Sequence, residues 1–427
     1  MVRLAAAGLV ALAGLCVSSL VAQQRSDAFG SPLTHPAIGY TTRATTDRIA
    51  RLNEDLRRGA LRLPFDAANG YLRGVLAATR VPVESQLLVY SETSSQAERI
   101  NIGNPRAIFF DDDLAIGWVR GADALEVAVQ DPEQGVVFYT LGQKDVATPQ
   151  FTRDDRCLLC HDIWETFGVP GFQVLSTFPM ADEKAYASGL VTDHRTPFQQ
   201  RWGGWFVTGR AVPTHHLGNL PVVRPATSRA TPQAPVLTSV KDRVDLTGSP
   251  SDTSDVVALM VLEHQSRMAN LITWLGWEAR VASSGGGSAG PTGEPADHVA
   301  FVARQVVDYM LFVDETALAR PVDGGSGFAE RFAAGGKRDR LGRSLRQLDL
   351  RTRLFRYRCS YMIDSAAFEA LPGAAKQAVY GRLWDVLSGA DRSAPYRVLS
   401  RSDRQAVAEI LRATHDDLPA SFGIVTQ

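Results

Sequence analysis

The sequence has few cysteines, almost no net charge, and no long apolar run beyond its first residues. Four cysteines occur in 427 residues, and 45 Lys and Arg balance 46 Asp and Glu. A net charge of −1 gives no reason to expect nucleic acid as a partner, and no low-complexity block suggests disorder. The length allows two or three modest domains, with small molecules or other proteins as partners.

Residues 1–22 predict a signal peptide. Arg3 is followed by an uncharged apolar run over 4–21, and Ala22 provides a small residue for cleavage. An uncleaved membrane anchor is the alternative, although this run is at the short limit for spanning a bilayer. Cys16 follows Leu15, which is the wrong residue for a lipidation site. We therefore expect a periplasmic or otherwise exported protein without a transmembrane span after cleavage near Ala22.

The residue pattern after the leader predicts an α+β fold in three segments. Segment 23–150 starts with helices near 46–61 and 70–79. An antiparallel β-meander follows, with strands near 87–90, 107–110, 114–119, 125–129 and 136–141. Segment 151–235 is rich in loops, and segment 236–427 is mainly helical. Helices are expected near 254–282, 297–317, 340–363, 366–388 and 401–414, with a Gly/Ser linker at 283–293.

The strongest motif is Cys157-Leu158-Leu159-Cys160-His161, which has the spacing of a c-type haem attachment site. One helical turn places both sulfurs at the porphyrin edge and the His below the iron. Export supports this interpretation, because such haems are attached outside the cytoplasm. We expect one covalent haem c on Cys157 and Cys160, with His161 as proximal iron ligand and the helical C-terminal part enclosing the haem.

Three other interpretations of this motif remain open. A thioredoxin-like redox pair needs a βαβ setting, whereas the strands before Cys157 are expected to be antiparallel. A zinc site needs further ligands, and the sequence has no second Cys-x-x-Cys and no His-x-x-x-His. A structural disulfide between Cys157 and Cys160 is the third. Cys359 lies in an apolar pattern and is expected to be a small buried residue.

The second axial position of the iron has several candidates: Met180, His194, His215 or His216, and His264. His264 falls on the apolar face of the helix expected near 254–282, where a hydrogen-bonded core His is the alternative. His216 lies in a loop about 55 residues after the motif and is narrowly preferred. His415, in the C-terminal tail, is expected to face solvent.

The chain also resembles an uncharacterised group of exported bacterial cytochrome c-like proteins with a single Cys-x-x-Cys-His. Beyond the motif, the resemblance covers most of the chain after residue 85. It rests on Gly168-Val169-Pro170-Gly171, Asp193-His194, Arg201-Trp202-Gly203-Gly204-Trp205, Thr208-Gly209, His216-Leu217-Gly218-Asn219, Glu263-His264-Gln265, Asn270-Leu271-Ile272-Thr273, Ser360-Tyr361-Met362-Ile363, Leu371-Pro372 and Val379-Tyr380. That group often has Met where this chain has Leu217, which implies that position 217 is not the ligand and leaves His216.

Basic and aromatic residues suggest further haem contacts. Arg201 and Trp202 could pack at the haem edge, and Arg201 or Arg210 could pair with a propionate; packing of a loop over a core is the alternative. Segment 337–358 has nine basic and two acidic residues, which indicates a solvated helix face, a surface for an acidic redox partner or a site for the haem propionates.

The expected function is electron transfer by an exported monohaem cytochrome, exchanging electrons with a redox protein or a small molecule. The alternative is a peroxidase- or oxidase-like haem enzyme with an open distal site, since the chain is large for one electron-carrying haem. A haem-based sensor or a subunit of a redox complex is a third class.

The predicted signal peptide leads to a direct test. The mature protein should lack about 22 residues, because a signal peptidase cuts after the small residue that follows the apolar run. Mass spectrometry of the purified protein's N-terminus measures this. A membrane-bound product that still begins at Met1 would favour the anchor instead.

Overall fold

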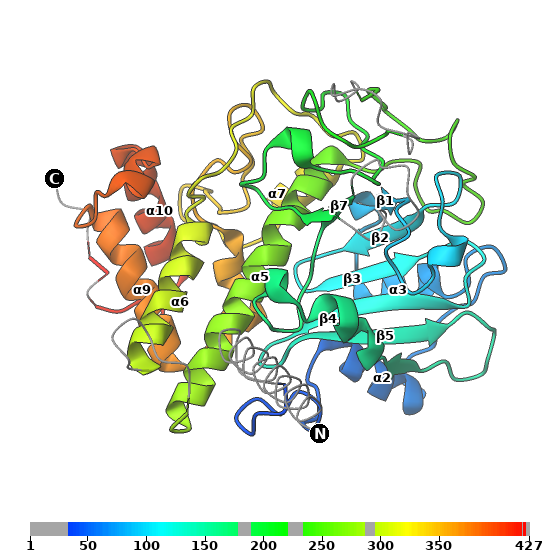
Figure 1. Ribbon diagram of the computed structural model, residues 1–427, viewed down its shortest axis with the longest axis horizontal. Helices are drawn as coiled ribbons and strands as arrows, with labels where there is room; N and C mark the ends of the chain where they lie inside the picture. Colours follow the sequence, from blue (N-terminus) through cyan, green and yellow to red (C-terminus); the bar gives the residue numbers. More distant parts are fainter. Residues whose placement is uncertain (1–32, 178–188, 221–233, 287–294, 421, 424–427) are drawn as a thin grey trace, which may run out of the picture.

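The computed structural model describes residues 33–177, 189–220, 234–286, 295–420 and 422–423. Within them the fold is α+β, as predicted, with an antiparallel sheet in the N-terminal half and helices in the C-terminal part (Figure 1). In these ranges, no helix combines the length and the apolar character needed to cross a membrane.

The sheet has six strands in sequence order, each antiparallel to the next. They are β1 Leu87–Val89, β2 Arg106–Phe110, β3 Leu114–Trp118, β4 Ala124–Asp131, β5 Gly135–Gly142 and β6 Phe151–Arg153. The first five confirm the predicted meander. The sixth extends the sheet into the segment expected to consist of loops.

One face of the sheet packs against two helices, α2 (Arg48–Arg57) and α3 (Leu72–Thr79). Alternate strand residues such as Ile116 and Val127 point to this side and are fully or almost fully buried. The carboxylate of Asp47 caps α2 and also accepts a hydrogen bond from the Tyr139 hydroxyl at 2.8 Å. This face is therefore closed by the N-terminal helices.

The other face of the sheet carries the alternate strand residues that point away from α2 and α3. One region of this face packs against α5, and a second region packs against the segment with the cysteine motif. At one end, Gln130 donates a hydrogen bond to the hydroxyl of Thr273 on α5 (Val256–Ser283), at 3.1 Å. Farther along, half-buried Ala115, Glu126 and Ala128 lie on the same side of the sheet as Phe138. This second region faces the segment that carries the cysteine motif.

Helix α5 is the axis of the helical part. In Figure 1 it runs between the sheet and three other helices, α6 (Pro295–Met310), α9 (Gly373–Ser388) and α10 (Arg401–Thr414). The pattern predicted one inward face, but nearly every residue of α5 is buried because it is covered from several sides. Two shorter helices are α7 (Phe328–Ala334) and α8 (Ala366–Glu369).

The helix expected near 340–363 is absent from the described chain, so that prediction is wrong. Asp349 accepts hydrogen bonds from the backbone N–H groups of Arg351 and Thr352, which stabilises a turn in place of a helix. Leu350 has a positive φ of 57°, which a helix does not allow. The helix expected near 366–388 is divided into α8 and α9 around Pro372.

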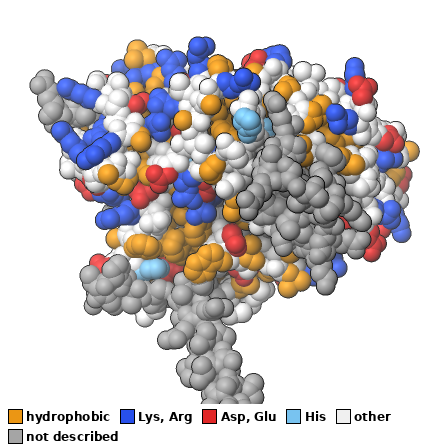
Figure 2. Space-filling view, turned by 45° about the horizontal axis from the view of Figure 1, so that its top comes forward, with side chains coloured by type: hydrophobic (Ala, Val, Ile, Leu, Met, Phe, Trp, Pro, Cys, Tyr) orange, Lys and Arg blue, Asp and Glu red, His pale blue; other side chains and the backbone are white. Residues whose placement is uncertain are grey.

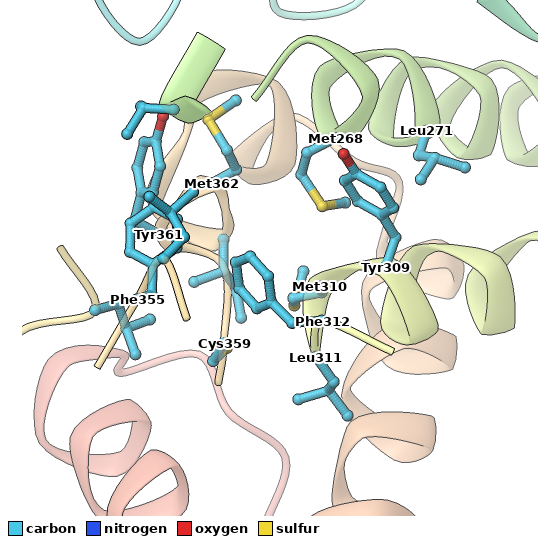
Figure 3. Close-up of a cluster of buried hydrophobic side chains, with 14 of the residues drawn as sticks. Met268, Leu271, Tyr309, Met310, Leu311, Phe312, Phe355, Cys359, Tyr361 and Met362 are labelled. Carbon is cyan, nitrogen blue, oxygen red and sulfur yellow. The ribbon is translucent and has the colours of Figure 1, made fainter. Parts of the chain in front are cut away.

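Cys359 lies in the apolar core of this helical part. Figure 3 draws it with Phe312, Phe355 and Met362 in one buried cluster, and its exposed fraction is 0%. This confirms the expectation of a small buried residue.

Candidate functional site

The cysteine motif folds as one turn of helix after β6. A short 3-10 turn, Asp155–Cys157, leads into α4 (Leu158–His161), and Cys157 itself has helical angles, φ −59° and ψ −26°. Positions three and four apart in a helix share one face. The backbone therefore brings Cys157, Cys160 and His161 to one side of a single turn.

His161 is held by its own backbone and by the loop that follows. Its Nδ1 lies 2.9 Å from the Gly171 carbonyl oxygen, and the Gly171 N–H donates to the His161 carbonyl at 2.9 Å. The ring packs on Phe138, with centroids 4.8 Å apart. Burial lowers the pKa of His161, so its imidazole is neutral at pH 7. When Nδ1 donates to Gly171, the lone pair of Nε2 is available to a metal.

The loop over 167–172 ties this turn to the sheet and to α5. The Val136 N–H on β5 donates to the Pro170 carbonyl at 3.0 Å. Asn270 on α5 makes two bonds to the backbone of Phe172, accepting from its N–H at 2.9 Å and donating to its carbonyl at 2.8 Å. These contacts fix the position of Gly171, and through it the imidazole of His161.

Both cysteines of the motif are free thiols, Cys157 partly buried and Cys160 exposed. Burial, together with the charges of Asp154 and Glu126, raises the pKa of Cys157 to about 11. A redox-active cysteine has the opposite property, a lowered pKa, and a βαβ setting that the antiparallel sheet does not provide. The surroundings of Cys157 therefore do not match a thioredoxin-like pair.

Large apolar side chains next to the motif are exposed. Leu159 is 84% exposed and Trp164 is 65% exposed. The fit to a haem comes from the donor set: the thiols of Cys157 and Cys160 and the imidazole of His161 share one side of the turn, and the residues present therefore fit a covalently attached haem.

His194 and His264 lie together in the helical core, each with an exposed fraction of 3% or less. Their Nδ1 atoms are 2.9 Å apart, and Nε2 of His264 is 2.7 Å from the Ser360 hydroxyl. Both ring nitrogens of His264 are thus engaged within the protein. The inward orientation predicted for His264 is confirmed.

His216 lies at the β1 edge of the sheet. Its ring packs against Trp202 at 5.1 Å, and its Nδ1 accepts from the Gly218 N–H at 3.1 Å. This segment joins the sheet through a bridge between Val89 and Trp205. β5, which supports His161, is four strands away, or roughly 19 Å at the usual strand spacing of about 4.8 Å.

All eight histidines are among the described residues, and none of the other seven forms a hydrogen bond or ring contact with the cysteine motif. His264 would have to give up the bond of one ring nitrogen to bind an iron, whereas Nε2 of His194 is buried without a hydrogen-bond partner in the described part of the chain. Met180 lies outside the described residues. His415 is buried, with Nε2 3.1 Å from Asp364, so its expected solvent exposure is wrong.

Arg201 and Arg210 have different surroundings. Arg201 is 2% exposed and pairs with Glu263 at 3.0 Å, while it also donates to the carbonyls of His194 and Thr196. Burial raises the pKa of Glu263, and the charge of Arg201 opposes this rise. Arg210 is on the surface and pairs with Asp323 at 2.8 Å. Among the described residues, neither arginine nor buried Trp202 forms a hydrogen bond, ion pair or ring contact with the cysteine motif.

The basic segment 337–358 is irregular rather than a helix face. Five of its nine cations are paired with acidic residues: Lys337, Arg343, Arg346, Arg353 and Arg358. In Figure 2, Lys and Arg side chains are interspersed with Asp and Glu over the face that is drawn. Much of the local excess of +7 is therefore compensated by other parts of the chain.

Phe138, Gly171 and Asn270 are parts of the site that residue types alone do not predict. Phe138 belongs to a strand pattern, and Asn270 is 109 residues after His161. Two of them did carry a signal: Gly171 in the Gly-Val-Pro-Gly segment and Asn270 in Asn270-Leu271-Ile272-Thr273, both shared with the resembling group. In the described ranges, no three His, Cys, Asp or Glu side chains gather so as to hold a metal ion by themselves.

The buried ion pair leads to a stability prediction. Arg201→Met should lower the free energy of unfolding by about 3–5 kcal/mol, because Glu263 would remain buried without its cation. Arg210→Met removes an exposed pair and should cost at most about 1 kcal/mol. Urea denaturation followed by fluorescence gives both values. Equal losses in the two variants would contradict the structural role of Arg201.

Comparisons with known proteins do not assign a family. No protein-family model, no curated protein and no solved structure matches this chain. Any function must therefore be argued from the residues themselves.

Proposed function

We propose that the chain is an exported c-type cytochrome with one haem attached covalently to Cys157 and Cys160. His161 is the proximal iron ligand. The observation that carries the proposal is the single helical turn with two free thiols and a neutral imidazole whose Nδ1 bonds to the Gly171 carbonyl. A bond from the other nitrogen of a metal-bound His to a carbonyl is the usual way in which proteins orient this ligand.

The protein's own residues orient and partly cover the group. Phe138 supports the His161 ring from the sheet, and Leu159 and Trp164 supply apolar surface. When bound, the haem supplies reversible one-electron chemistry, with a potential set by its ligands and burial. The helical part contributes to the enclosure of the haem through α5, which holds the loop over 167–172.

Electron transfer is the leading function. Cys160 and Leu159 are exposed, so one edge of an attached haem would lie near the surface, where a redox protein or a small molecule can approach. The proposed location is the periplasm or another exported compartment.

A haem enzyme with an open distal side is the second candidate. One observation favours it: both ring nitrogens of His264 have partners in the fold, and Nδ1 of His194 and of His216 are also bonded elsewhere. Without a sixth ligand, the iron would be open to peroxide or another small molecule.

Covalent attachment is tested with a pair of variants. Expression in the periplasm with cytochrome c maturation proteins should give a red protein whose haem survives denaturation. Replacing Cys157 and Cys160 together by Ala should abolish covalent haem. The control is Cys359→Ala, because this third thiol is buried and distant from the motif in sequence. A colourless wild-type protein under these conditions would overturn the proposal.

The visible spectrum then separates the two candidates. A six-coordinate low-spin iron supports electron transfer, whereas a high-spin iron that binds carbon monoxide on reduction supports the enzyme. If the spectrum is low-spin, His216→Ala and His264→Ala show whether either His moves to the iron, since loss of the true ligand gives high-spin iron with covalent haem retained. If both variants remain low-spin, Met180 or His194 becomes the better candidate.

A further inference from the structure

An ion pair lies on the face of the sheet that also supports His161. Glu126 on β4 is opposite Thr140 on β5, and Thr140 is two residues from Phe138, the residue that contacts the His161 ring. Residues two apart in a strand point to the same side. The carboxylate of Glu126 is therefore on the motif side of the sheet, one strand away from the support of His161.

Arg106 reaches Glu126 across the strand between them. Gly117 on β3 is opposite Glu126, and a Cβ at Gly117 would lie only 2.8 Å from Nε of Arg106. The absence of a side chain at this position lets the guanidinium group cross β3 in contact with the sheet. Its Nη1 lies 3.3 Å from Oε2 of Glu126, and the exposed fractions of the two side chains are 23% and 16%.

The carboxylate of this ion pair is also held in place by hydrogen bonds. Glu126 accepts hydrogen bonds from the hydroxyls of Ser94 and Ser95. Two opposite charges are thus held in place, largely shielded from solvent, and salt screens such charges less than exposed ones.

Both charges act on the motif. Burial is the main cause of the low pKa of His161, while the charge of Arg106 lowers it further and that of Glu126 raises it. The same two charges have opposite effects on the pKa of Cys157. The position of the pair on the sheet face that supports His161 places both charges beside the motif.

We infer that Arg106 and Glu126 set the reduction potential of the haem held by His161, Arg106 favouring the reduced iron and Glu126 the oxidised iron. This inference rests on the proposed function. A positive charge disfavours the more positive oxidised iron, and a negative charge disfavours the reduced iron. Neither residue is a ligand; both act through their charge at a fixed position on the sheet.

The experiment compares midpoint potentials of variants that first show normal covalent haem content and an unchanged spectrum. Arg106→Gln should lower the potential and Glu126→Gln should raise it. Each variant should change the equilibrium constant for reduction by up to roughly tenfold. A tenfold change corresponds to a shift of about 59 mV in the potential for one electron. The double variant should return close to the wild type, because the two charges offset each other.

Two controls separate charge from structural damage. Arg106→Lys keeps the charge and should keep the potential, even if the Gln variant loads haem poorly. Arg57→Gln removes an exposed cation from α2, which packs on the opposite face of the sheet, and should have no effect. The inference would be overturned if both Gln variants changed the midpoint potential in the same direction, or by no more than Arg57→Gln does. Covalent haem would be present in that case, so the proposed function would stand. A wild-type protein without covalent haem would instead overturn the proposed function and this inference with it.

Discussion

The two reciprocal hydrogen bonds between His161 and Gly171 are the contacts on which the proposed site depends. They hold the single helical turn against the loop that follows it. They also fix the orientation of the imidazole of His161, a residue that is partly exposed to solvent. This loop is in turn held by β5, through Val136, and by α5, through Asn270. The sheet and the helical part thus both contribute to the position of one nitrogen atom.

The residues predicted for the haem site fall mainly into two groups with different surroundings. One is the motif, which lies near the surface with its apolar neighbours exposed. The other is the core cluster of His194, His264, Arg201 and Glu263, in which buried groups bond mainly to one another. Buried charges that are paired in this way contribute to a defined core, in which Nε2 of His194 is left without a hydrogen-bond partner among the described residues. The haem hypothesis therefore concerns the motif and the sheet face beside it.

Local patterns were sufficient to predict the meander and the helical turn of the cysteine motif, because strand alternation and the Cys-x-x-Cys-His spacing are properties of neighbouring residues. Contacts between distant residues could not be predicted in this way. Arg201 was expected beside the haem, but it meets Glu263, 62 residues later in the chain. The expected helix near 340–363 failed because Asp349 and the positive φ of Leu350 favour a turn. His216 was plausible as a ligand by its loop setting, yet the bridge to β1 places it at the far edge of the sheet.

The central claim is that Cys157 and Cys160 carry one haem. The most direct measurement is the mass of the intact, denatured protein after periplasmic expression with the cytochrome c maturation proteins. The account predicts one species heavier than the mature polypeptide by a single haem. A species with the mass of the polypeptide alone would contradict it.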